Sequence, residues 1–132
     1  MIDLSFFKRK KDSAKKPLQS KEWPDYVVSL DKESFNEFIE RYPLSVIDFW
    51  APQCNPCKIM SPRVRRLSKV YKGKVACGKL NTQENQDIAK QYKIMGIPHL
   101  AFFHYGKKVM SITGVRSIGG IKDTINDLLK KQ

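Results

Sequence analysis

The sequence predicts an α/β sandwich built on a mixed β-sheet, and three observations support this prediction. The 132 residues suit one compact domain. Strand-like and helix-like segments alternate in the order βαβαβαββα, which is typical of a sheet with helices packed on it. Only Tyr105-Gly106 separates the last two strand-like segments, so these strands should form an antiparallel hairpin and make the sheet mixed.

Each element follows from the spacing of its apolar residues. The expected strands are residues 26–30, 45–50, 75–80, 99–104 and 107–113. The second of these is almost continuously apolar, which favours a buried central strand. The expected helices have apolar faces over residues 35–42, 60–71, 88–92 and 118–129. Asp31 is expected to cap the first helix, Pro43 to end it, and Gly73 to end the second.

Composition excludes several classes of protein. Apolar residues make up 41% of the chain, enough to bury a core without disulfides or metal. No segment approaches the roughly 20 unbroken apolar residues of a membrane-spanning helix. Three cysteines leave one unpaired, which argues against a disulfide framework. Residues 1–22 are expected to form a basic, flexible tail without a secretory signal pattern, and residues 23–132 one domain of a cytoplasmic protein.

The positive charge of the chain is uneven. The net charge is +12, and the segment from Lys58 to Lys79 contains eight cations and no acid. We favour a solvated helix face as the explanation for this segment. The alternative is a basic binding module that docks on nucleic acid, an anionic membrane or an acidic protein, with help from the basic tail. No RNA-recognition signature supports a nucleic-acid partner.

The chemistry of the chain is expected at Cys54-Asn55-Pro56-Cys57, directly after the buried strand and at the start of the next helix. Backbone N–H groups and the dipole at a helix N-terminus favour an anion, so the first thiol should be held partly as thiolate. Pro56 has no N–H to lose in the first turn of a helix.

Two alternatives to redox chemistry remain for these thiols. A zinc site needs four ligands, and the only further candidates are Cys77, His99 and His104. Inert structural thiols would not need a strand-to-helix junction. We therefore favour redox chemistry, and we expect neither a metal nor a cofactor.

The segment from Val46 to Lys58, which reads VIDFWAPQCNPCK, resembles the active-site segment of thioredoxins. The resemblance continues through Pro62, Lys79-Leu80-Asn81, Gly96-Ile97-Pro98, Gly106 and Gly114, and so covers residues 23–132. It implies the thioredoxin fold, a central mixed sheet flanked by helices on both faces. It also implies thiol–disulfide exchange with protein substrates.

The resemblance and the physical chemistry together assign roles to four residues. Cys54 would be the attacking nucleophile, and Cys57 the more buried resolving thiol. Asp48 is a lone acid in an apolar strand, so burial should raise its pKa and let it accept the proton of Cys57. Lys79 matches the family lysine that tunes this acid, although a surface lysine that only packs its stem is the alternative.

The resemblance also implies a substrate-binding surface next to the thiols. Ile97-Pro98 stands where thioredoxins carry a cis-proline, and the backbone before that proline pairs with the substrate strand. Trp50, Asn55 and Pro56 are the other expected substrate contacts.

Three departures from the family pattern bear on redox direction. Asn55 replaces a glycine, Gln53 a tryptophan and His99 a threonine. A donor on Asn55 or a protonated His99 would stabilise thiolate and make the pair more oxidising. We favour a neutral His99 bonded to backbone, and we interpret Cys77 as a buried structural thiol.

The sequence therefore predicts a monomeric protein-disulfide reductase for cellular redox homeostasis, recharged by a thioredoxin-reductase-type donor. Its substrates would be disulfide-containing proteins. A disulfide oxidase or isomerase tuned by Asn55 and His99 is the variant of this function, and the basic binding module is the rival.

Overall fold

The structure is a computed structural model that describes residues 18–132. The basic cluster between residues 8 and 16 lies outside this range, and the tail predicted for residues 1–22 stays a prediction. The described chain begins with Leu18, which packs against the core, and with a 3-10 turn, η1 (Ser20–Glu22), ahead of the buried Trp23. No helix of residues 18–132 is long and apolar enough to cross a membrane.

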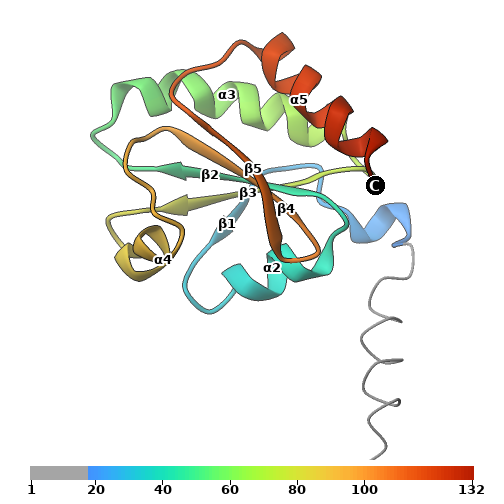
Figure 1. Ribbon diagram of the computed structural model, residues 1–132, viewed down its shortest axis with the longest axis horizontal. Helices are drawn as coiled ribbons and strands as arrows, with labels where there is room; N and C mark the ends of the chain where they lie inside the picture. The colour runs from blue at the N-terminus through green and yellow to red at the C-terminus, as the bar shows by residue number, and fades with distance from the viewer. Residues whose placement is uncertain (1–17) are drawn as a thin grey trace, which may run out of the picture.

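Five strands form one mixed sheet in the order β1-β3-β2-β4-β5 (Figure 1). They are β1 (Val28–Leu30), β2 (Ser45–Trp50), β3 (Ala76–Asn81), β4 (His99–His104) and β5 (Lys107–Thr113). β1, β3 and β2 are parallel, whereas β4 runs antiparallel to β2, and β5 antiparallel to β4. The predicted α/β fold with a mixed sheet and a final hairpin is confirmed.

Helices cover both faces of this sheet (Figure 1). α3 (Asn55–Val70) and α5 (Ile118–Lys130) lie on one face, and α2 (Phe35–Arg41) and α4 (Gln86–Gln91) lie on the other. Because successive side chains of a strand point to opposite faces, β2 contributes Val46 to the core under α3 and α5, and Ile47 and Phe49 to the core over α2. β2 is therefore buried on both faces, as its apolar run predicts.

Three predicted elements begin later than the sequence pattern suggests, and one of them, β3, begins at Ala76, one residue after the predicted start. β1 starts only at Val28, because its ladder with β3 starts there, and Tyr26 is 59% exposed. α2 starts at Phe35, since Asp31 Oδ1 first accepts hydrogen bonds from the backbone N–H groups of Glu33 and Ser34 at 3.0 and 2.9 Å. Asp31 thus caps a turn that leads into α2, and Ser34 is the N-cap residue itself.

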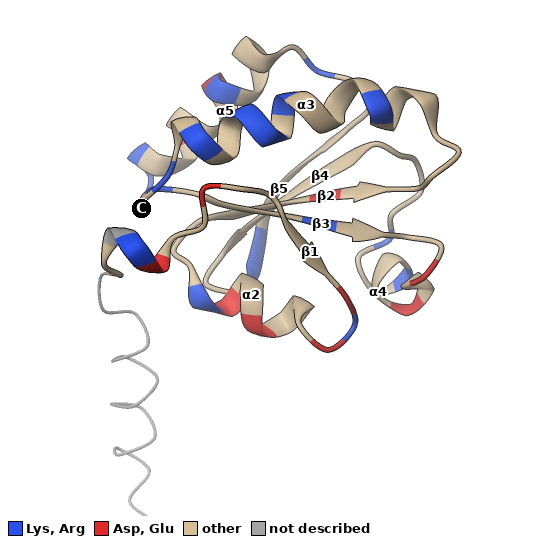
Figure 2. Ribbon diagram, turned by 180° about the vertical axis from the view of Figure 1, so that it is seen from behind, with Lys and Arg blue, Asp and Glu red and all other residues tan. Residues whose placement is uncertain are grey.

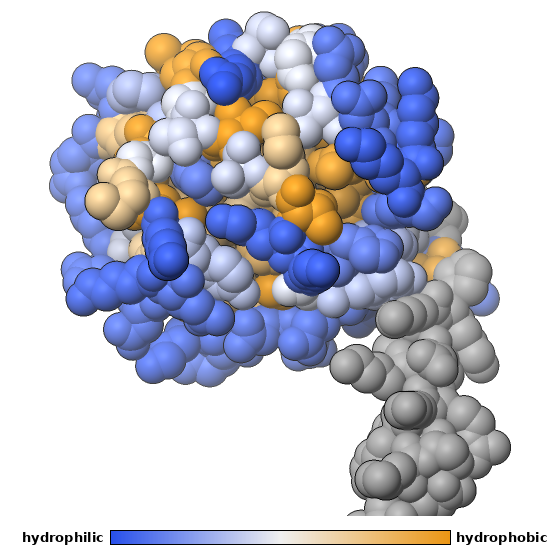
Figure 3. Space-filling view, viewed as in Figure 1, coloured by the Kyte–Doolittle hydropathy of each residue, from blue (hydrophilic) through white to orange (hydrophobic). Residues whose placement is uncertain are grey.

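The second edge strand, β5, is mostly exposed, and its Val109 and Met110 are each 42% exposed. Figure 3 shows apolar side chains among polar ones on this side of the molecule. Lys107 and Lys108 at the start of β5 and a register shift at Phe102/Phe103 in its ladder make the edge a poor template for pairing with another chain.

Close packing at Gly78 in β3 gives a test of this fold. A Cβ atom there would approach Leu30 Cδ1 to 2.7 Å, Ile47 Cδ1 to 3.1 Å and Phe38 Cε1 to 3.2 Å. We expect Gly78→Val to lower the free energy of unfolding by about 1–3 kcal/mol, as overpacked cores do. The measurement is urea unfolding followed by circular dichroism.

The matched control is Gly119→Ala in α5, where an added Cβ meets nothing within 4 Å. This change should leave stability equal or raise it by about 0.5 kcal/mol, because alanine favours a helix over glycine. An unchanged urea midpoint for Gly78→Val would contradict the packing of β3 against α2.

Candidate redox site

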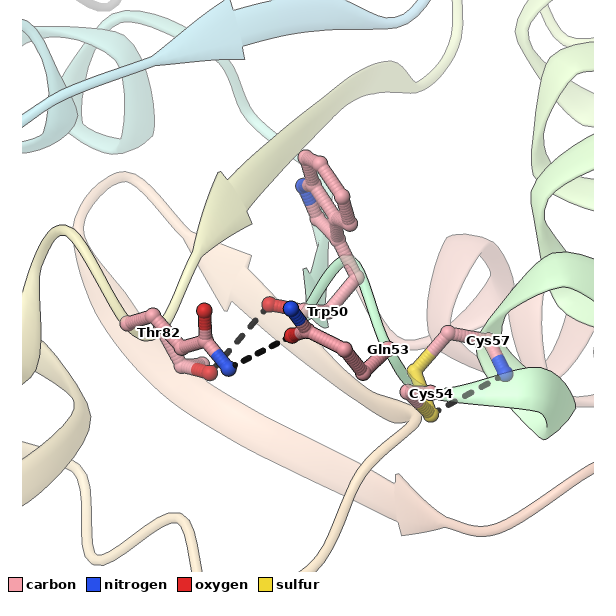
Figure 4. Close-up of a disulfide and its surroundings, with 6 residues drawn as sticks. Trp50, Gln53, Cys54, Cys57 and Thr82 are labelled. Atoms are coloured by element: carbon pink, nitrogen blue, oxygen red, sulfur yellow. Dashed lines mark hydrogen bonds between the residues drawn. A yellow bond between two sulfur atoms is a disulfide. The ribbon is translucent and has the colours of Figure 1, made fainter.

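The Cys54–Cys57 pair lies where β2 passes into α3. α3 begins at Asn55, so Cys54 is its N-cap residue, and Pro56 stands in its first turn. The two cysteines form a disulfide with their Cα atoms 5.2 Å apart (Figure 4). Cys54 Sγ accepts a hydrogen bond from the backbone N–H of Cys57 at 3.2 Å. The predicted position of both thiols at a helix start is confirmed.

The two sulfur-bearing residues differ in exposure. Cys57 is 4% exposed, whereas Cys54 is half-buried and Asn55 and Pro56 beside it are exposed. A substrate can therefore reach Cys54 but not Cys57. When the pair is reduced, the N–H of Cys57 and the dipole of α3 favour the thiolate of Cys54.

Asp48 supplies a buried carboxyl group on the same side of the sheet as α3. It shares a face of β2 with Val46, which packs under α3, and it is only 3% exposed. Its Oδ1 atom has no hydrogen-bond partner within the described residues. Burial raises the pKa of this carboxyl from 3.8 to about 7, and the positive charge of Lys79 offsets part of that rise. The predicted rise of the pKa is thus found.

Asp48 lines two small cavities, and one of them also reaches Cys57. One, of about 140 Å³, is also lined by Cys57, Trp50 and Lys79. The other, of about 160 Å³, lies between α3 and the edge of the sheet. Either volume has room for water, since one molecule needs only about 10–15 Å³ of such space. Cys57 and Asp48 therefore face a common space that is large enough for a water molecule.

Ser61 lines both cavities, although it was not predicted as a site residue. It stands four residues after Cys57 in α3, and residues at this spacing share one face of a helix. That spacing is the signal that could have placed the Ser61 hydroxyl beside Asp48.

Lys79 lies beside Asp48, because the two residues are paired in the β2–β3 register. Its Nζ atom is 5.7 Å from the centre of the Trp50 ring, a cation–π distance, and its side chain is half-buried. Lys79 thus lines the cavity wall and acts on Asp48 through its charge, without a direct ion pair in the described part of the chain.

The Ile97–Pro98 peptide bond is cis, as the resemblance implies. β4 begins directly after Pro98, and its first residue pairs with Phe49 near the end of β2. The Ile97-Pro98 segment therefore lies at the same end of the sheet as the start of α3. The N–H of Gly114 donates to the carbonyl of Pro98 at 2.8 Å and holds the next loop beside this segment.

Two exposed apolar residues flank these loops and were not predicted as site residues. Met95, just before Gly96, is 93% exposed, and Val115, just after Gly114, is 40% exposed. With Ile97, they give the thiol end of the sheet an apolar surface in the absence of a tryptophan at position 53.

Gln53 is held by a neighbouring loop instead of lying free. Its Oε1 atom accepts a hydrogen bond from Gln83 Nε2 at 3.0 Å. Thr82 in the same loop donates twice to the Trp50 carbonyl, from its backbone N at 2.9 Å and from its hydroxyl at 3.2 Å (Figure 4). The segment before Cys54 is therefore fixed to the end of β3.

His99 faces away from Asp48, because it pairs with Phe49 and shares the face of α2. Its Nδ1 atom forms a 2.9 Å hydrogen bond with Thr113 Oγ1, a side-chain partner and not the backbone partner expected. Burial and the charge of Lys108 lower the pKa of His99, so the ring stays neutral near neutral pH. This geometry agrees with the interpretation of His99 as a core residue.

The remaining thiol, Cys77, lies on the same side of the sheet as Asp48, and the remaining imidazole, His104, contacts the chain at Pro43. Cys77 is fully buried, and burial raises its pKa to about 12, in line with a structural thiol. His104 Nδ1 contacts the Pro43 carbonyl at 2.7 Å. In residues 18–132 no three His, Cys, Asp or Glu side chains gather as a metal site.

The fold and the site together define a class of protein. A mixed five-stranded sheet carries a disulfide between closely spaced cysteines at a helix start, and a buried carboxyl shares a cavity with the inner cysteine. Such a site exchanges disulfides and needs no further group to do so.

Comparisons with known proteins agree with this class. Residues 26–127 match the family model for thioredoxin. An M-type chloroplastic thioredoxin from Spinacia oleracea is 41% identical over 106 residues, 80% of this chain and 56% of the relative, so the chain spans little more than half of that protein. A thioredoxin from Buchnera aphidicola subsp. Schizaphis graminum is 34% identical over 105 residues, 79% of this chain and 97% of the relative.

A solved structure agrees as well. A mutant thioredoxin from Halobacterium salinarum matches with a TM-score of 0.76 and 26% identity, over 81% of this chain and 94% of that one. The chain therefore belongs to the thioredoxin family, whose members are thiol–disulfide oxidoreductases.

The buried carboxyl of Asp48 makes stability depend on pH. Because its folded pKa is about 7 and its unfolded value 3.8, the folded protein binds this proton more tightly than the unfolded chain. The contribution of Asp48 to stability is then most favourable at a pH below 3.8, the pKa of this carboxyl in the unfolded chain, and the free energy of unfolding falls as the pH rises towards about 7. Between about pH 5 and about pH 8.5, we expect the free energy of unfolding of the oxidised wild type to fall by about 3 kcal/mol more than that of Asp48→Asn.

Urea unfolding at both pH values measures this difference. The variant leaves a buried amide in place of the acid, so its absolute stability carries a pH-independent offset of about 1–3 kcal/mol. Parallel pH dependences for the two proteins would contradict a raised pKa of Asp48.

Proposed function

We propose that this protein is a protein-disulfide reductase that serves cellular redox homeostasis. The observation that carries the proposal is the asymmetry of the site. Cys54 is accessible and held at the N-terminus of α3, whereas Cys57 is 4% exposed and lies beside a carboxyl of pKa about 7. This asymmetry supports attack by Cys54 and resolution by Cys57.

In the first step, the Cys54 thiolate attacks one sulfur of a substrate disulfide. A bond forms between Cys54 Sγ and that sulfur, the substrate S–S bond breaks, and the second substrate sulfur leaves as a thiolate that takes up a proton. The N–H of Cys57 and the α3 dipole stabilise the Cys54 thiolate before attack.

In the second step, Cys57 resolves the mixed disulfide. Its thiol passes a proton to the Asp48 carboxylate through the cavity that both residues line. The Cys57 thiolate then attacks Cys54 Sγ, and the substrate leaves as its second thiolate. Two electrons have moved: the substrate is now a dithiol and the protein is the Cys54–Cys57 disulfide found in the structure.

A dithiol donor of the thioredoxin-reductase type must return these two electrons for the next cycle. The proposed substrates are proteins with accessible disulfides. Ile97 and Pro98 would present the backbone edge that pairs with the substrate strand, and Trp50, Asn55 and Pro56 would line the contact around Cys54. Exposure of Met95 and Val115 supports an apolar contact on the same surface.

We further propose that the protein acts in a reducing compartment as a monomer. The fully buried free thiol of Cys77 fits such a compartment. The thioredoxins of bacterial origin support the cytoplasm, whereas the chloroplastic relatives make an organelle stroma the alternative.

Cysteine variants test the two steps separately. With dithiothreitol as the electron donor, the wild type should reduce insulin disulfides, and Cys54→Ser should lose at least about 1000-fold of this activity, because the nucleophile is gone. Cys57→Ser should instead accumulate mixed disulfides with substrate, seen as adducts on non-reducing gels. Retained turnover in Cys54→Ser would reject the assignment.

Asp48→Asn provides the matched test of proton transfer. Resolution of a preformed mixed disulfide should slow by about 10- to 100-fold near neutral pH, since general base catalysis is worth roughly that much or more. Initial attack by Cys54 should change less, because the helix terminus stabilises that thiolate. An unaltered resolution rate and pH profile would make Asp48 a structural residue only.

The reduction potential decides between the reductase and the oxidase or isomerase. We expect a value near about −270 mV, typical of reducing dithiols, and not near about −120 mV. His99→Thr should shift it by less than about 15 mV, because His99 is neutral and on the other face of the sheet. A wild-type value above about −180 mV, measured against glutathione, would favour the oxidase or isomerase.

A further inference from the structure

One side of α3 carries a row of exposed cations, which we name the basic stripe: Lys58, Arg65, Lys69 and Lys72. Their spacings of seven, four and three residues place them along one line of the helix and its last turn. At 1.5 Å per residue the line is about 21 Å long. It runs beside the buried face of α3, next to the edge of the sheet where Arg65 and Lys69 line the cavity with Lys79.

Among residues 18–132, the cations of the stripe have no carboxylate partner. Arg65 donates to the Ser61 hydroxyl at 3.0 Å, and Lys69 to the backbone carbonyl of Asp25 at 3.2 Å. The one ion pair within the described residues, Lys32–Asp87, is elsewhere. Figure 2 shows blue bands of Lys and Arg and no red band along α3, whereas red bands of acidic residues lie on α2, α4, β2 and the connections on either side of β1.

This arrangement is unfavourable for the isolated protein. Arg65 and Lys69 stand four residues apart and Lys69 and Lys72 three apart, so like charges are neighbours on the helix surface. An anionic partner would remove this repulsion, and a field of one sign would speed its encounter with the protein.

The stripe is continuous with the redox site. Lys58 follows Cys57 directly and lines the cavity that Cys57 and Asp48 share. A chain bound along the stripe would therefore have one end beside the disulfide. In extended conformation, about six residues span about 21 Å.

We propose that the basic stripe is a docking surface for disulfide-bearing protein substrates with an acidic segment within about seven residues of the reactive cysteine. The proposal rests on the proposed reductase function and names its preferred substrate class. A polypeptide fits better than a nucleic acid, because only a polypeptide can bring a disulfide to Cys54. The exposed apolar residues of α3, Ile59 and Val70, are aliphatic and give bases no stacking surface, and Tyr26 is the one exposed ring at the cavity beside the stripe.

Two synthetic peptides test this surface with the full-length protein. Both contain the same disulfide loop, followed either by a run of glutamates or by glutamine at each of those positions. We expect the wild type to reduce the glutamate peptide with a kcat/KM at least about fivefold higher at about 20 mM ionic strength. This preference should fall towards unity at about 500 mM, where the Debye length is only a few ångströms.

Two double variants separate the effect of charge in the stripe from the effect of charge elsewhere on the surface. Lys69→Glu/Lys72→Glu changes two cations far from the thiols and should abolish or invert the preference for the glutamate peptide. The matched control, Lys90→Glu/Lys107→Glu, changes exposed lysines on α4 and β5 and removes the same charge. It should retain most of the wild-type preference, so an equal loss in both variants would show an effect of net charge and overturn the proposal.

Peptide binding and peptide reduction separate the proposed reductase function from the proposed docking surface. Equal reduction of both peptides by the wild type would overturn the docking surface and leave the reductase function intact. Reduction of neither peptide would reject the reductase function, and fluorescence anisotropy would then test whether the glutamate peptide still binds more tightly. Displacement of that peptide by a DNA oligonucleotide or by anionic phosphatidylserine vesicles at lower concentration would assign the stripe to that partner and reject ours.

Discussion

The burial of one carboxyl group in the central strand is the constraint on which the rest of the site depends. β2 is covered by helices on both faces, so a polar side chain in it cannot reach bulk water as a surface residue would. Asp48 is tolerated there because burial raises its pKa to about 7, so that a large fraction of it is protonated near neutral pH, and because two cavities adjoin it. A group with a pKa of about 7 can both take and release a proton near neutral pH.

Much of this arrangement could be predicted from the sequence because its determinants are local. The apolar run of β2 and the short turn between β4 and β5 give the bounds of these strands as the structure has them. The position of Cys54 at a helix start follows from a strand that ends shortly before Pro56. The raised pKa of Asp48 could also be predicted locally, since Asp48 is the one charged residue in an almost continuously apolar strand.

The rest depends on contacts between distant segments. The late start of β1 is set by the β3 ladder, and the late start of α2 by the side-chain bonds of Asp31. The hydrogen bond between Gln53 and Gln83 joins residues 30 apart in the chain, and no periodicity encodes it. The face on which His99 lies follows only from its register with Phe49, so its role near the thiols could not be decided before the pairing was known.

A comparison of the two buried cysteines indicates why the proposed mechanism assigns resolution to Cys57 and not to Cys77. Cys77 and Cys57 are both almost inaccessible, and both belong to the side of the sheet that α3 covers. Burial raises the pKa of Cys77 to about 12, and the charge of Asp48 adds to this rise, so Cys77 stays protonated. Burial of Cys57 would have the same effect if it acted alone.

Cys57 differs from Cys77 in two contacts. It lies in the first turn of α3, where the helix dipole favours its thiolate, and it shares a cavity with the Asp48 carboxyl. A carboxylate repels a neighbouring thiolate but accepts the proton of a neighbouring thiol, so Asp48 assists only while it takes the proton and becomes neutral. In the proposed mechanism the buried acid therefore promotes ionisation of Cys57 at the moment of resolution, and its desolvation is the source of the basicity that this step requires.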